Sequence, residues 1–171
     1  GLGIAMITFI YSITNTTAAV TLLCLAAMPF FTALLAFLFL REQISVSVWI
    51  SIIIATIGII IMALGNTETN SIVGFVFGIT SSIGFSVFSV TLRWRKETPK
   101  FTTVAVAGLF CFIFATIVIL IKGQIFFSSS YNSSLFSLHG TLVCMGLILY
   151  SIGSKAIPAA ELTLLSLTEV I

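Results

Sequence analysis

The stretch Ala18–Leu40, AAVTLLCLAAMPFFTALLAFLFL, decides the fold of this chain. It contains no charged side chain and is followed at once by Arg41 and Glu42. A run of about 20 apolar residues has the length that an α-helix needs to cross about 30 Å of hydrocarbon. We therefore predict that this stretch crosses a lipid bilayer as a helix.

The rest of the chain repeats this pattern. Its 171 residues are 59% hydrophobic and only 7% charged, whereas about 25% of the residues of a soluble domain are charged. Four further complete spans are predicted, at Val46–Leu64, Ile72–Leu92, Thr103–Ile121 and Leu135–Gly153. The shorter apolar runs 1–13 and 156–171 are interpreted as helices cut by fragment boundaries. The predicted fold class is an all-α, polytopic transmembrane helix bundle, truncated at both ends.

The composition also excludes several classes of function. The cysteines lie singly in apolar runs and only one histidine is present, so no metal site is predicted. The net charge of +2 is too small for a nucleic-acid-binding protein. The sequence holds no cluster of nucleophiles and bases and no close pair of carboxylates. We therefore expect neither an enzyme nor a cofactor.

Basic residues predict the orientation of the bundle. Four of them fall in one link, namely Arg93, Arg95, Lys96 and Lys100. The positive-inside rule places such a link in the cytoplasm. Alternate crossing then puts Arg41 and Lys155 on the same side and leaves Lys122 as the single basic residue outside. We expect a multi-pass protein of the cytoplasmic membrane with loop 93–100 in the cytoplasm.

The first and last hairpins have related sequences. Tyr11-Ser12-Ile13 precedes Ala18-Ala19, and Tyr150-Ser151-Ile152 precedes Ala159-Ala160. An odd number of predicted crossings separates the corresponding helices, so the two copies are inverted in the membrane. Inverted repeats are the architecture of many secondary transporters, whose binding site lies near the bilayer midplane between the repeats. The pattern therefore predicts a carrier that works by alternating access.

Three stretches carry a family resemblance. Residues 25–45, with their proline and terminal glutamate, resemble the fourth helix of EamA-type transporters of the drug/metabolite transporter superfamily. Residues 49–65 are similar to the fifth helix of that family and residues 159–170 to the ninth, with Val170 in place of the usual proline. The resemblance implies the third to ninth of ten helices. It makes residues 1–65 the end of a first five-helix repeat and residues 71–171 the larger part of a second.

The same resemblance implies a function. Members of this family transport small organic metabolites, amino acids or drugs, often outward, and differ in whether protons drive them. We therefore expect a small-molecule solute, efflux as the direction and protons as a candidate coupling ion. A non-transporting membrane scaffold or subunit is the alternative reading.

Glu169 is the first candidate for a transport residue. It lies about 12 residues, or about 18 Å, into the last apolar run. This depth is near the bilayer centre, where a charged side chain costs about 3 kcal/mol. Either it lines a wet cavity, where it binds an amine or exchanges a proton, or it is protonated and hydrogen-bonded to a neighbouring helix. Glu161, nearer the cytoplasmic end, is either a gate or an ordinary interfacial residue.

Pro29 predicts a kink, because proline removes a backbone hydrogen bond inside a helix. The repeat places Pro29 opposite Val170 and hence beside the level of Glu169, which makes it a candidate cavity residue. Tyr11 and Tyr150 occupy equivalent places in the two copies. They either line the cavity or lie at the membrane interface.

Two further motifs concern helix ends and helix packing. The helix-end motif Arg41–Glu42 is either a membrane anchor or a gate. A stripe of small residues recurs at every fourth position, which places it along one helix face; it consists of Gly74, Gly78, Ser82 and Ser86. Such a stripe allows close helix packing, within the fold or in a homodimer.

Overall fold

The computed structural model describes residues 1–42, 46–65, 72–95, 99–123 and 130–166, and all secondary structure in these ranges is helical. The elements are α1 (Leu2–Asn15), α2 (Ala18–Leu25), α3 (Met28–Leu35), the π-helix η1 (Ala36–Leu40), α4 (Val46–Gly65), α5 (Ile72–Trp94), α6 (Lys100–Lys122), α7 (Ser130–Gly153) and α8 (Ala159–Ser166). The predicted all-α, polytopic class is confirmed.

Four segments of the described chain are long and apolar enough to cross a membrane: Ala18–Leu40, Ile72–Trp94, Phe101–Ile121 and Ser133–Gly153. They correspond to four of the five predicted spans. The fifth predicted span is also one helix, α4, without a charged residue. The apolar helix α1 is shorter.

The span Ala18–Leu40 is interrupted in its middle. Helix α2 ends at Leu25, and the amide of Ala27 binds the carbonyl of Cys24 at 3.2 Å in a tighter turn. Pro29 then lies in the first turn of α3, where its missing N–H costs nothing. The predicted kink is therefore a break, located just before the proline.

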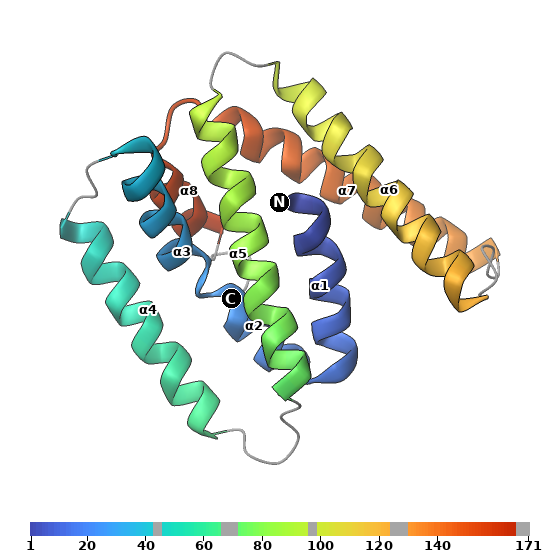
Figure 1. Cartoon of the computed structure of the whole chain (residues 1–171), viewed down its shortest axis with the longest axis horizontal. Coiled ribbons are helices and arrows are strands. Elements are labelled where there is room, and N and C mark those ends of the chain that lie inside the picture. Colours follow the sequence, from blue (N-terminus) through green and yellow to red (C-terminus); the bar gives the residue numbers. More distant parts are fainter. Residues whose placement is uncertain (43–45, 66–71, 96–98, 124–129, 167–171) are drawn as a thin grey trace.

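Helix α5 lies at the centre of the bundle (Figure 1), with α1 along one side and α2–α3 along another. Helix α4 lies at the outer edge beyond α2–α3, and α8 packs against α3. Helices α6 and α7 contact each other on the α1 side of the bundle. Both are largely exposed and apolar, as expected for surfaces that face lipid.

Hydroxyl side chains, and not only large apolar ones, form the interior. The residues with 0% exposure include Ser12, Thr21, Thr32, Ser82, Ser86, Ser89, Ser151 and Thr163. Lipid is as apolar as leucine, so helices in a membrane gain little from burying apolar side chains against each other. Small residues and interhelical hydrogen bonds hold them together instead.

Candidate transport site

Helix α5 presents a row of buried serines to its neighbours. Ser81 Oγ donates to the carbonyl of Ala5 in α1 at 2.8 Å. In α1, Ser12 Oγ donates to the carbonyl of Gly74 at 2.8 Å and lies 2.9 Å from Thr21 Oγ1 of α2. We call the set Ser12, Thr21, Ser81, Ser82 and Ser86 the hydroxyl seam. It joins α5 to α1, α2 and α3.

Two seam serines bind carbonyls on either side of the broken span. Ser82 Oγ donates to the carbonyl of Cys24 at 2.5 Å, and Ser86 Oγ donates to the carbonyl of Met28 at 3.1 Å. The carbonyl of Cys24 also accepts the amide of Ala27, so Ser82 adds a second hydrogen bond to it. Ser82 and Ser86 therefore stabilise the interruption beside Pro29, a role that their spacing alone does not reveal.

The two glycines of the small-residue stripe mark the closest approach of α5 to α1 and α2. A Cβ atom at Gly74 would lie 2.7 Å from Thr16 Cβ, and one at Gly78 would lie 2.8 Å from Cys24 Cβ. Only glycine fits at such distances. The glycines of the stripe thus pack against other segments of the same chain. Close packing within the fold is one of the two roles that the spacing left open.

The two equivalent tyrosines contact the same helix at different depths. The ring of Tyr11 lies against Phe77, with the centroids 5.5 Å apart. The ring of Tyr150 meets Phe85 edge-on at 5.4 Å, and its hydroxyl donates to Ser89 Oγ at 2.8 Å. Tyr11 and Tyr150 therefore lie against successive parts of α5.

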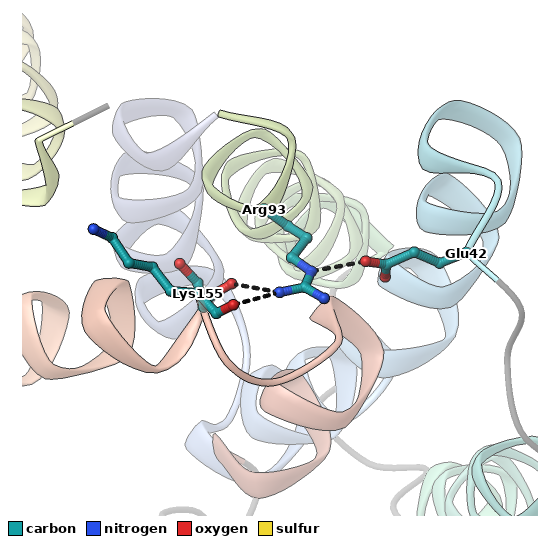
Figure 2. A network of polar contacts seen from close by, with 4 residues as sticks. Glu42, Arg93 and Lys155 are labelled. Atoms are coloured by element: carbon teal, nitrogen blue, oxygen red, sulfur yellow. Dashed lines mark hydrogen bonds and ion pairs between the residues drawn. The ribbon is translucent and has the colours of Figure 1, made fainter. Parts of the chain in front are cut away.

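A charged cluster lies at the C-terminal end of α5. Arg93 Nε donates to Glu42 Oε1 at 2.7 Å, and Nη1 donates to the backbone carbonyls of Ser154 and Lys155 at 3.3 and 2.8 Å. Figure 2 shows the guanidinium between these partners. The side chains of Arg93 and Glu42 are only 12% and 23% exposed. We call this group the Arg93 cluster.

The remaining candidates are not brought together. Arg41 is exposed and ends η1 in a left-handed conformation with φ of 53°. Glu161 is half-buried in the first turn of α8, where a negative charge favours the helix. Glu169 lies outside the described residues.

Three buried hydroxyl oxygens have no hydrogen-bond partner within the described part of the chain: Thr16 Oγ1 after α1, Thr32 Oγ1 in α3 and Ser151 Oγ in α7. Such groups are rare in folded proteins and call for an explanation. Over the same residues, no group of three or more metal-binding side chains occurs.

Comparison with known proteins adds to this geometry. Residues 1–64 match the model of the EamA-like transporter family. Two proteins named "Uncharacterized transporter", from Helicobacter pylori strains J99 and 26695, are each 32% identical over 95 residues, covering 56% of this chain and 32% of each relative. No solved structure matches the chain.

The EamA resemblance read from the sequence is thereby confirmed. The chain spans about a third of the length of the curated relatives it matches. Together with the four apolar spans, the match shows a multi-pass membrane protein related to EamA transporters.

Sequence reasoning missed the Arg93 cluster. Arg93 was used only to orient the bundle, because nothing local in the sequence pairs it with Glu42. A usable signal was present: alternate crossing puts the ends of η1, α5 and α7 on one side of the membrane, so their polar residues can meet. The serines of α5 were likewise interpreted by size, although hydroxyls in an apolar span are also hydrogen-bond donors.

Proposed function

We propose that the protein is a carrier that moves a small organic solute out across the cytoplasmic membrane by alternating access. The match of residues 1–64 to a transporter family supports this class of function. The broken span Ala18–Leu40 is the observation that carries the proposal. Interrupted helices with unwound backbone near mid-membrane form the binding sites of many secondary transporters.

The arrangement of the two hairpins supports the inverted repeat. The α1–α2 hairpin meets the N-terminal part of α5, where Ser12 binds Gly74. The α7–α8 link meets the C-terminal end, where its carbonyls bind Arg93. Related sequences thus lie at opposite ends of one central helix, as inversion requires.

The orientation follows from the same contacts. Arg93 joins segments next to Arg41 and Lys155, so these basic residues lie toward one end of the bundle. By the positive-inside rule this end faces the cytoplasm. The loop 93–100 is cytoplasmic in this proposal.

The solute site lies beside the broken span. Thr32 follows the break by one turn and holds an unpartnered buried hydroxyl, which can bind a polar group of the solute. Glu169 follows α8 in the sequence, and α8 packs against α3. In this proposal Glu169 reaches the same site and binds an amine or carries a proton.

Transport assays with Glu169→Gln test the function. The protein, expressed from its complete reading frame, is reconstituted in liposomes with a pH gradient, and uptake of L-amino acids, alkylamines and ethidium is measured. We expect the wild type to move at least one of these and Glu169→Gln to lose at least about 10-fold in rate, as for removal of a proton-transfer group. Glu68→Gln, which neutralises a carboxylate between α4 and α5, is the control.

The outcomes separate the parts of the proposal. If neither the wild type nor Glu169→Gln moves any of the solutes, with or without a pH gradient, the carrier assignment fails. The result would then favour a non-transporting scaffold. If Glu169→Gln and wild type transport equally and the gradient has no effect, the carrier stands and the role of Glu169 is structural.

A further inference from the structure

The Arg93 cluster connects segments from both halves of the chain. Glu42 follows η1 in the first half, whereas Ser154 and Lys155 belong to the α7–α8 link of the second. Arg93 of α5 lies between them and uses different nitrogens for the two sides. One guanidinium thereby holds three segments together at one end of the bundle (Figure 2).

A buried apolar layer involves the same elements. Ala36 of η1, Val90 of α5 and Ala159 of α8 pack together, with exposures of 1%, 6% and 1%. Val90 precedes Arg93 by about one helical turn, and Ala159 follows Lys155 by about one turn's length of chain. The apolar layer thus lies on the membrane side of the charged cluster.

We infer that the Arg93 cluster is a latch that closes this end of the carrier. This inference rests on the proposed alternating access, in which the two ends open in turn. Glu42 positions the guanidinium through Nε, and Nη1 then holds the α7–α8 link against α5. Release of the two carbonyls lets this link move away and uncovers the layer of Ala36, Val90 and Ala159.

The chemistry of the cluster suits a reversible closure. A charge-assisted hydrogen bond to a partly exposed carboxylate is strong enough to favour the closed conformation. Once broken, the bond can form again. The planar guanidinium donates in several directions at once, which an ammonium group cannot reproduce. The latch therefore needs arginine at position 93 and a carboxylate at position 42.

Cysteine labelling tests the latch without any solute. Cys111 and Cys144 are replaced by alanine, and two reporters are compared: Ala159→Cys with Cys24→Ala, and the native Cys24 alone. Sealed vesicles of known orientation are treated with a membrane-impermeant sulfonated maleimide. Native Cys24 is 1% exposed between α2 and the N-terminal half of α5, away from the Arg93 end.

We expect Glu42→Gln to raise the labelling rate at position 159 about 10-fold, because a bond to a charged group is lost. This increase in labelling rate should appear only when the reagent is on the side of the membrane that the Arg93 end faces. The labelling rate of Cys24 should stay low. Lys155→Gln is the matched control, since it removes a nearby charge while only the backbone carbonyl of Lys155 takes part in the cluster. The labelling rate at position 159 in this control should equal the rate in the same protein with Lys155 in place.

An unchanged rate at position 159 overturns the latch. So does an equal rise at Cys24, which shows general loosening of the bundle by loss of a structural staple. If Glu42→Gln does not fold, Arg93→Lys takes its place in the experiment, because one ammonium group cannot bind Glu42 and the α7–α8 link together. Arg93→Lys should raise the labelling rate at position 159 from the same side of the membrane. Labelling needs no transport, so failure of the carrier assignment and failure of the latch are distinguishable.

Discussion

Replacing Gly78 by alanine should destabilise the bundle, because α5 lies too close to α2 there for a methyl group. The added Cβ would lie 2.8 Å from Cβ and 2.9 Å from Sγ of Cys24, and 3.0 Å from Ser12 Oγ. The Cβ of Cys24 is fixed by the backbone of α2 and cannot turn away. The two helices must therefore separate locally.

The magnitude follows from two opposing terms. Overpacking of this kind costs about 1–3 kcal/mol, while alanine has a helix propensity better than that of glycine by about 1 kcal/mol. Gly146→Ala in α7 is a matched control, because a Cβ there meets no atom within 4 Å. Both variants share the propensity gain. The difference between their free energies of unfolding should be about 1–3 kcal/mol.

Unfolding by SDS in mixed micelles, followed by circular dichroism, gives these free energies. In the double variant Gly78→Ala/Cys24→Gly the closest contacts disappear. The two changes should therefore be non-additive, with a coupling of about 1 kcal/mol or more. If Gly78→Ala and Gly146→Ala unfold at the same SDS fraction, the close contact between α5 and α2 is refuted.

Two further predictions concern buried serines of α5 and use the same titration. Ser82→Ala should lower the free energy of unfolding by about 0.5–1.5 kcal/mol, because the bond from Ser82 Oγ to the carbonyl of Cys24 is lost. Thr91→Ala, whose hydroxyl bonds back to its own helix, should change this free energy by less than about 0.5 kcal/mol. Equal effects of the two substitutions would contradict the seam. Tyr150→Phe should cost about 0.5–1.5 kcal/mol by losing the bond to Ser89 while keeping the ring against Phe85, and the cost should vanish in a Ser89→Ala background.

Much of the fold can be predicted from the sequence, because lipid imposes simple rules on length and polarity. The long apolar runs specify helices, since only internally bonded backbone is tolerated in hydrocarbon. Pro29 specifies an interruption in the same way. Its form, a break at Ala26 and Ala27 with two neighbouring carbonyls bound by α5, depends on tertiary contacts and cannot be read from the span alone.

Less of the candidate site is predictable. The sequence singled out Tyr150 and the small-residue stripe, yet gave no partner for either. Partners such as Ser89 for Tyr150 and Glu42 for Arg93 lie more than 50 positions away in the chain. Such pairs depend on which helix faces which, and uniformly apolar spans carry little information about their rotation. Glu169 stays a prediction from its depth in an apolar run.

The hydroxyl seam constrains how the proposed carrier can move. The proposed repeats place α5 in the second repeat, but its serines and glycines fasten it to α1, α2 and α3, which the same proposal places in the first. Separating the repeats between residues 65 and 71 would break several buried hydrogen bonds at about 0.6 kcal/mol or more each. It would also remove the hydrogen bonds that Ser82 and Ser86 make to the carbonyls beside the break. A movement that keeps the seam intact has to carry α5 with the first repeat. The bond between Tyr150 and Ser89 and the bonds between Arg93 and the α7–α8 link then cross the moving boundary, and the Arg93 bonds lie at its end, where a latch has to be.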